Sequence, residues 1–463
     1  MITQKERQMK KIFNMKSLLL SAVAVMGLTA CSDSDSGQSP DELVQEQNTA
    51  IEALVAEYTN DVVYDTYGKL AAKSEALYNA INAVKQKLTA ATPETVTKDE
   101  IGAICTLYKE ARAEWEESEA FLFGAADEYD IDPHIDTWPL DVEVLAADLA
   151  DDNKIAALNS ENGIEWARAT GNLTPENLGF HGLEFIFFRD GKNRDEAIFN
   201  NNAIEDYVDA EGNKFFEGKN VTGKEEIIFA AAIAGDLRDK CYQLEVCWMG
   251  EAKAPAAHVA RIKACIAAGD DSFGLFKEGT NLSYGDNLNR AAGTTYNSWK
   301  KSLEQIFDGC NDICSEVADL KMGQAYRVST DPSHATHEEE DEDTGETIIV
   351  KDDVNYIESP YSHNSFTDFK GNIQSIKNSL YGGRSLTTPT EKSIMAYLEK
   401  YNPELAADVD AKLNAALNAL DACLKSGKSF VEAPGAPVVG TAIEAISDLD
   451  SQISEAKSWV LAN

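Results

Sequence analysis

Basic residues are scarce in this 463-residue chain: 41 lysines and arginines stand against 79 aspartates and glutamates, so the formal net charge is −38. A surface this acidic repels nucleic-acid phosphates and anionic lipid headgroups. We therefore expect no nucleic-acid partner. The same charge suits solubility, which is its commoner role, and it also suits cation binding.

The N-terminal apolar segment, residues 17–28, is too short to span a bilayer, which takes about 20 residues. It follows a basic stretch and precedes small residues and Cys31. This order resembles a bacterial lipoprotein signal, cut before an acylated cysteine. We expect residues 1–30 to be removed, residues 31–42 to form a flexible tether, and a lipid on Cys31 to be the membrane anchor. The acidic tether resembles export tracts of surface lipoproteins, so we expect an outer-membrane lipoprotein at the cell surface, or otherwise facing the periplasm.

Cysteine is sparse as well. The seven cysteines after Cys31 include no CxxC pair and no zinc-finger spacing. Cys310 and Cys314 are one helical turn apart, which indicates small core residues rather than a disulfide or a pair of ligands. The sequence also lacks a G-x-S-x-G, a P-loop and a dinucleotide fingerprint.

Strand signals are few, whereas the 3.6-residue apolar period of amphipathic helices runs through most of the chain. The period predicts helices at 43–62, 67–92, 98–123, 152–169, 223–249, 255–268, 288–320, 366–381, 388–425 and 439–461. A chain of this length exceeds one ordinary core. We therefore expect an all-α fold of two helical bundles with a cleft between them and minor β-hairpin excursions.

Two polar stretches interrupt this pattern. The glycine-rich stretch 209–225 predicts a boundary between an N-terminal bundle, residues 43–215, and a C-terminal bundle, residues 216–463. The acidic stretch 329–353 is expected to be a solvated insertion with a hairpin near Gly345.

A histidine and a glutamate three residues apart lie in the apolar run GFHGLEFIFF, residues 179–188. The spacing alone says little, because His337 and Glu340 share it within the acidic stretch, where solvated neighbours impose no geometry. His181 and Glu184 instead lie on a predicted helix that is apolar all round and therefore buried. A buried carboxylate must be paired, metal-bound or protonated.

Glycines and further acidic residues accompany this pair. Gly179, one turn from a second glycine, would let another backbone or a ligand approach closely. Upstream, the apolar stripe of the predicted helix 98–123 continues into Glu119, with Glu116 three residues earlier, and the acidic loop that follows contains Asp136. Carboxylates with one imidazole on bundle helices are a common means of holding iron, manganese or zinc. A hydrogen-bonded polar network without metal is the alternative.

Three blocks of the sequence, in the same order, resemble the imelysin-like family, which includes an insulin-cleaving membrane peptidase and iron-regulated lipoproteins. The resemblance covers nearly the whole mature chain. It implies an all-α fold of two bundles with the G-x-H-x-x-E signature facing a cleft between them. The matching positions are Gly179, His181 and Glu184 in the signature; Trp115, Ile135, Asp136, Trp138 and Pro139 upstream; and Ser362, Asn364, Asp368, Asn372, Tyr381, Gly382 and Gly383 in the C-terminal half.

The resemblance also implies a ligand set. Related iron-binding components of ferrous-iron uptake systems carry an E-x-x-E, an acidic I-D and the H-x-x-E. These fall here on Glu116, Glu119, Asp136, His181 and Glu184. Those relatives have a tyrosine before the first glutamate where this chain has Trp115.

The leading hypothesis is thus a lipoprotein that binds a metal ion, or a small metal-carrying ligand, between the bundles for iron uptake, with an outer-membrane transporter as a possible partner. Iron is favoured, with zinc or manganese as alternatives. A metal-dependent peptidase is the first alternative function, although the H-E-x-x-H and H-x-x-E-H patterns are absent and a third histidine would have to be His134 or His363. The second is a surface adaptor that binds a glycan or peptide in a cleft lined by Trp115, Trp138 and Trp248.

Overall fold

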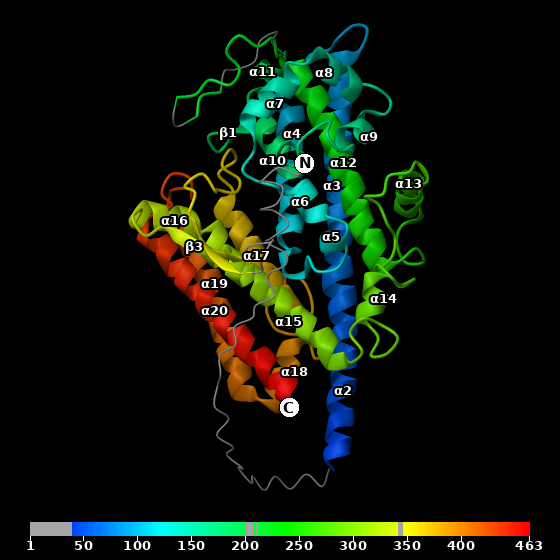
Figure 1. Ribbon diagram of the computed structural model, residues 1–463, viewed down its shortest axis with the longest axis vertical. Helices are drawn as coiled ribbons and strands as arrows, with labels where there is room; N and C mark the ends of the chain where they lie inside the picture. Colours follow the sequence, from blue (N-terminus) through cyan, green and yellow to red (C-terminus); the bar gives the residue numbers. More distant parts are fainter. Residues whose placement is uncertain (1–38, 201–206, 210–211, 341–345) are drawn as a thin grey trace.

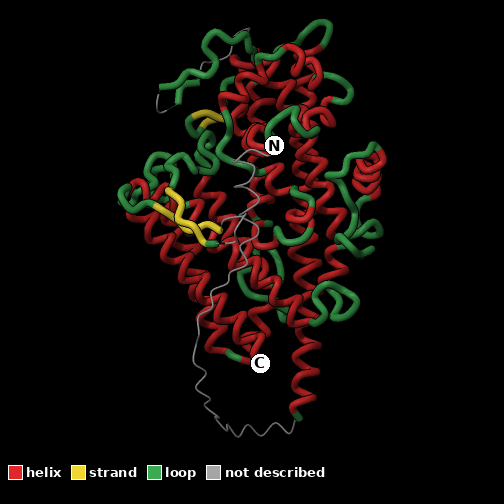
Figure 2. The backbone as a smooth tube through the Cα atoms, in the orientation of Figure 1, coloured by secondary structure: helices red, strands yellow, loops and turns green. Residues whose placement is uncertain are grey.

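The computed structural model describes residues 39–200, 207–209, 212–340 and 346–463. Within these ranges the chain is helical almost throughout, and strand is confined to two small antiparallel pairs (Figure 2). The prediction of an all-α fold with minor hairpins is confirmed. The predicted signal segment, Cys31 and the tether as far as residue 38 lie outside the described residues.

The first half of the described chain runs from α2 to α11. In order, its elements are α2 (Pro40–Glu57), η1 (Tyr58–Tyr64), α3 (Asp65–Thr89), α4 (Lys98–Glu116), η2 (Glu119–Phe121), α5 (Ala125–Glu128), α6 (Ile131–Ile135), α7 (Val142–Leu149), α8 (Asp152–Leu158), α9 (Gly163–Arg168), η3 (Pro175–Asn177), α10 (Gly179–Phe187), β1 (Phe188–Arg189), β2 (Lys192–Asn193) and α11 (Glu196–Asn200).

The second half runs from α12 to α20. Its elements are α12 (Gly223–Met249), α13 (Ala256–Ala267), α14 (Tyr284–Leu288), α15 (Trp299–Ser315), η4 (Glu316–Lys321), α16 (Gly323–Thr330), β3 (Thr336–Glu340), β4 (Thr347–Lys351), α17 (Ser365–Tyr381), α18 (Ile394–Tyr401), α19 (Pro403–Leu424) and α20 (Pro437–Ala462).

A long helical rod runs along the length of the molecule (Figure 1). It begins at a capping box, in which Ser39 and Glu42 satisfy each other's backbone amides, and it continues through α2, η1 and α3 without a loop. The sequence predicted two helices, 43–62 and 67–92. No proline or turn cluster separates them, and the π-helical turn η1 joins them into one continuous helical rod.

Two sets of helices pack around this rod. Helices α4 and α12 lie against α3, and α10 lies against α12, whereas α15, α17, α19 and α20 pack against one another. Contacts between α4 and α17 join the two sets. Because α12 packs with the N-terminal helices, the chain after residue 216 contributes to both sets. The boundary between residues 215 and 216 stays a prediction.

Several predicted helices are shorter than their apolar patterns. The 288–320 segment starts its long helix only at Ser298, which caps α15, and the 388–425 segment breaks before Pro403, which begins α19. The 152–169 segment divides into α8 and α9. At the starts of α15 and α19 a capping side chain, joined by a proline in α19, competes successfully with the apolar period. The described ranges contain no helix with both the length and the apolar character needed to cross a bilayer.

Candidate metal centre

The close approach of α10 to the loop after α6 creates the centre of the site. Gly179 begins α10 at a φ of +57°, and a Cβ there would lie 1.9 Å from the carbonyl oxygen of Ile135. Only glycine fits this combination of positive φ and backbone contact. The predicted close approach at Gly179 is therefore confirmed, and the approaching group is the backbone that carries Asp136.

Asp136 and His181 meet at this contact. Both side chains are buried, and His181 Nε2 lies 2.9 Å from Asp136 Oδ1. Trp115 donates its indole N–H to Asp136 Oδ2 at 2.7 Å. Burial opposes ionisation of Asp136, but Arg112 and His181 hold the pKa of its carboxyl well below the ordinary value. Asp136 is thus an ionised carboxylate in the protein interior.

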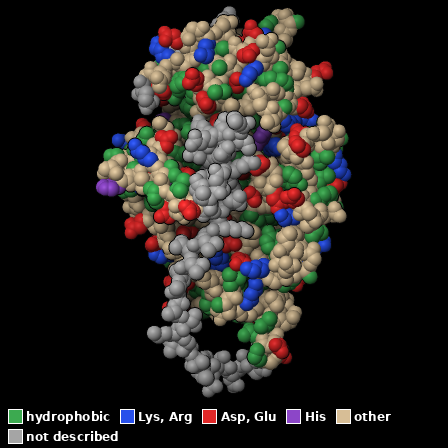
Figure 3. Space-filling view, viewed as in Figure 1, with side chains coloured by type: hydrophobic (Ala, Val, Ile, Leu, Met, Phe, Trp, Pro, Cys, Tyr) green, Lys and Arg blue, Asp and Glu red, His purple; other side chains and the backbone are tan. Residues whose placement is uncertain are grey.

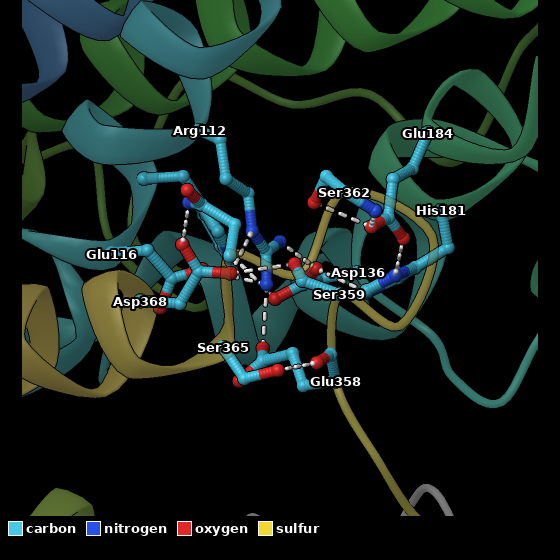
Figure 4. A network of polar contacts seen from close by, with 12 residues as sticks. Arg112, Glu116, Asp136, His181, Glu184, Glu358, Ser359, Ser362, Ser365 and Asp368 are labelled. Atoms are coloured by element: carbon cyan, nitrogen blue, oxygen red, sulfur yellow. Dashed lines mark hydrogen bonds and ion pairs between the residues drawn. The ribbon is translucent and has the colours of Figure 1, made fainter. Parts of the chain in front are cut away.

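Arg112, on α4, lies at the middle of the carboxylates (Figure 4). Its side chain is fully buried, and its guanidinium contacts Asp136, Glu116 at 2.6 Å and Glu358 at 2.5 Å. Helix α17 comes close enough to complete this group, because Gly371 leaves room for the side chain of Glu116. Asn372, also on α17, donates to Glu116 Oε2 at 2.6 Å.

Glu184 has a different position from the one expected of a ligand. Its Oε1 accepts hydrogen bonds from the backbone N–H of Tyr361 at 3.1 Å and from the backbone N–H and hydroxyl of Ser362 at 2.7 and 2.6 Å. Its other oxygen, Oε2, is 3.8 Å from His181 Nδ1. Glu184 therefore fastens the 361–362 loop to α10 and faces the imidazole from the side opposite Asp136.

A second group of charges adjoins the first. Lys321, at the end of η4, is buried, and its Nζ lies 3.4 Å from Glu119, 3.4 Å from Glu358 and 3.6 Å from Glu316. Glu119 is not on the long helix predicted for 98–123. Helix α4 ends at Glu116, and Glu119 starts the 3-10 turn η2, yet its side chain is still buried.

Several of the carboxyl groups have abnormal pKa values. Burial raises the pKa of Glu119 to about 8 and that of Asp368 to about 7, in each case despite a nearby cation. Burial also holds the pKa of Glu116 well above its ordinary value. For His181, burial lowers the pKa, but the hydrogen bond to Asp136 and the nearby carboxylate of Glu184 raise it more, to about 9. The interior here contains more acidic groups than its cations neutralise.

Two overlapping groups of side chains could hold a metal ion. Asp136, His181 and Glu358 form one, and Glu116, Glu119 and Asp136 form the other; in each, one ligand atom per residue lies within 4.8 Å of the rest. Four of the five expected ligands are thus brought together, and Asp136 belongs to both groups. Glu184 is in neither of these two groups among the described residues.

Sequence reasoning missed Glu358, Arg112, Lys321 and Glu316. One signal was present, because Arg112 is one helical turn before Glu116 on the same face of α4. No comparable signal marks Glu358, which lies in an irregular segment before α17 and far from the other residues in sequence.

The structure also places the remaining residues of the sequence signature. Asn364 donates to Asp368 at 2.5 Å, and Ser359 does the same from the other side. Trp138 is half-buried, with its ring 5.8 Å from that of His181. Trp115 and Trp248 are fully buried. For these two tryptophans, core packing accounts for the burial better than a glycan-binding cleft does.

The other histidines lie apart from the two groups. His134 is bonded to Asp236 on α12 at 2.6 Å, and neither His134 nor His363 belongs to the groups that could hold metal among the described residues. The prediction that His337 lies in a solvated stretch is wrong. His337 is buried on β3, where its ring contacts Asp352 at 2.8 Å and Glu339 at 2.9 Å, because the hairpin packs against α16.

The residues present fit a bound cation. Glu358 Oε2 and Glu184 Oε2 are buried oxygens that accept no hydrogen bond from the described residues, and such atoms are costly unless a ligand, water or ion satisfies them. Carboxylate oxygens with one imidazole nitrogen suit iron, manganese or zinc better than copper. Acidic groups are also common on the surface, where they are interspersed with basic ones (Figure 3). The acidic groups of the two potential ligand groups are buried instead.

Comparison with known proteins identifies the family. The sequence model of the imelysin family, peptidase M75, matches residues 63–455, which include every residue of the two groups. The chain belongs to the imelysin family.

Individual members of the family resemble this imelysin-family chain at low sequence identity. It is 23% identical over 401 residues to iron-regulated protein A of Synechococcus elongatus, an alignment that covers 86% of this chain and 84% of the relative. A crystal structure of an iron-regulated protein A precursor from Parabacteroides distasonis superposes with a TM-score of 0.62 at 23% identity and covers 91% of this chain and 96% of the other. An imelysin-like protein from Psychrobacter arcticum gives a TM-score of 0.47 at 13% identity, with 89% and 93% covered. The first structure shows that the fold is shared.

Proposed function

We propose that this imelysin-family protein binds a metal ion, with iron favoured over zinc and manganese, at the buried cluster centred on Asp136, and that it does so for iron uptake. The observation that carries the proposal is the excess of buried carboxylates over cations where two potential ligand groups share Asp136. A bound cation would neutralise that excess. Asp136, His181 and Glu358, or Glu116, Glu119 and Asp136, would hold it.

The names of two relatives support iron as the metal. The Synechococcus elongatus relative and the Parabacteroides distasonis structure are both described as iron-regulated protein A. The ligand types are consistent with iron, since hard carboxylate oxygens and an imidazole suit it. A small metal-carrying ligand, held in a cleft beside the cluster, is the variant of this proposal in which the metal arrives already bound.

The proposal includes a place for the protein. A lipid on Cys31 would anchor it to the outer membrane, at the cell surface or facing the periplasm, and an outer-membrane transporter would be its partner in uptake. The sequence order of a basic stretch, a short apolar stretch and a cysteine supports this part of the proposal. Radiolabelled palmitate incorporation that is lost in Cys31→Ala would test it.

The binding test compares two histidines. Elemental analysis of the protein purified without chelator, and melting curves with ferrous, ferric, manganous and zinc ions, should show about one metal per chain and a metal-dependent rise in Tm. His181→Ala should abolish both. His134→Ala is the matched control, because His134 also bonds an interior aspartate but is outside both ligand groups. Equal metal binding by wild type and His181→Ala would refute the group of Asp136, His181 and Glu358 and leave only that of Glu116, Glu119 and Asp136, which substitution of Asp136 then tests.

The uptake test uses cells. A strain that lacks the protein should accumulate radiolabelled iron more slowly than wild type under iron limitation, and the His181→Ala protein should not restore the rate. Normal accumulation in the deletion strain would contradict a role in uptake while leaving metal binding in place.

A further inference from the structure

The Lys321 ammonium makes no hydrogen bond of ordinary length to the carboxylates of the cluster, among the described residues. Ammonium–carboxylate bonds are usually about 2.7–2.9 Å long, whereas the nearest carboxylate oxygens to Lys321 Nζ are 3.4, 3.4 and 3.6 Å away, on Glu119, Glu358 and Glu316. The guanidinium of Arg112 contrasts with it, since Arg112 contacts its carboxylates at 2.5 and 2.6 Å. The ammonium is therefore surrounded by acidic groups but loosely bound.

The backbone turn that carries Lys321 is built to bring it to this point. Glu316 and Lys321 are the first and last residues of the π-helical turn η4. In an α-helix, residues five apart lie about 140° from each other around the axis. The wider π turn places them on one side, where Lys321 and Glu316 approach within 3.6 Å. Single π turns inside helices occur frequently at functional sites.

Lys321 also lies between the buried ligands and the more exposed edge of the cluster. Its side chain is 1% exposed, while the Glu316 side chain is 14% exposed. The ring of Trp138 lies 5.1 Å from Lys321 Nζ, and the ring of Tyr356 lies 5.2 Å from that of Trp138. Both aromatic side chains are half-buried. Glu119 and Glu358 are buried, and each belongs to a potential ligand group that contains Asp136.

We propose that the Lys321 ammonium is a tethered cation that an incoming metal ion displaces. In the metal-free protein, the ammonium neutralises the carboxylates of Glu119, Glu358 and Glu316. This inference rests on the proposed metal-binding function and adds a regulatory residue to it. Two of the three carboxylates around Lys321, Glu119 and Glu358, are also potential metal ligands. Metal and ammonium therefore compete for the same oxygens, and Lys321 weakens metal binding so that the ion can be released again.

Exposure of the lysine in the wild-type protein is the first test. The full chain is treated with a small amine-acylating reagent, with and without manganous ion, and modified lysines are quantified by mass spectrometry. Lys321 should be protected without metal and become reactive with it. Lys240 is the matched control, since it is equally buried but donates to Ser272 outside the cluster, and its labelling should not change. Unchanged or reduced labelling of Lys321 in protein that has bound manganese would overturn the inference.

Affinity is the second test. Lys321→Met and Lys321→Gln should bind manganous ion about tenfold more tightly than wild type or better, because removal of one unit charge from a poorly solvated site has at least that effect. Lys240→Met should bind as wild type does. Equal or weaker binding by a folded Lys321 variant would refute displacement. If wild type and all variants bind no metal, the proposed function fails instead, so the two failures are distinguishable.

Discussion

Substitution of Asp136 by asparagine is the sharpest test of the proposed centre, because Asp136 is the one residue common to both ligand groups. The variant keeps the size of the side chain and removes its charge. Asp136 accepts from Trp115 and contacts both Arg112 and His181. Removal of one partner from a buried ion pair costs about 3–5 kcal/mol. Since Arg112 keeps Glu116 and Glu358, we expect the lower end, about 3 kcal/mol.

The effect on metal binding should be larger than the effect on folding. Loss of a residue that supports a ligand usually costs 10–100-fold in metal affinity, so loss of the shared carboxylate should cost more than about 100-fold. Asp236→Asn is the matched control. Asp236 is also buried, it bonds His134 at 2.6 Å and lies 3.5 Å from Arg168, and it is outside both groups.

The assay measures both quantities on each variant. Urea unfolding of metal-free protein gives the free energy of unfolding, and titration with manganous or ferrous ion gives the affinity. Both variants should lose a similar free energy of unfolding. For a bundle of 150–250 residues, a loss of about 3 kcal/mol lowers Tm by about 6–12 °C. Only Asp136→Asn should lose metal affinity. Wild-type affinity in Asp136→Asn, or an equal loss in Asp236→Asn, would refute a centre at Asp136.

Three further predictions follow from the same structure. The Tm of the metal-free protein should fall as pH rises from about 6.5 to 9, because Glu119 (pKa about 8) and His181 (pKa about 9) both favour their protonated forms in the fold. The rise in Tm caused by metal should grow over the same range, since ligands must be deprotonated to bind metal. A Tm that does not change with pH, with and without metal, would contradict both expectations. Gly179→Ala should destabilise the protein by about 2 kcal/mol or more, since the positive φ alone costs about 1–3 kcal/mol and the added Cβ meets the Ile135 carbonyl; wild-type stability in chemical denaturation would show that α10 can shift. The seven described cysteines are free and buried, so a thiol reagent followed by mass spectrometry should modify none of them in the native state and all after unfolding; rapid native labelling would contradict their burial.

Much of the fold was predictable because helices leave a local record in the sequence. The apolar period placed α12 at residues 223–249, as the structure has it, and His181 and Glu184 on a buried helix. Helix ends were less predictable. The break before Pro403 and the late start of α15 depend on capping by Asn402 and Ser298, which can outweigh the apolar pattern.

The sequence by itself determined which side chains of each helix would be buried, since the 3.6-residue period decides the face that each one presents to the core. Thus Glu116 and His181 could be recognised as interior polar residues. Only the tertiary structure decided which of these residues meet. Glu358 joins the cluster from an irregular segment, Lys321 from a π turn, and Glu184 is occupied by the backbone amides of a loop 177 and 178 residues away. Contacts over such distances leave no periodic signal, because they depend on how α4, α10 and α17 pack and not on the pattern within any one helix.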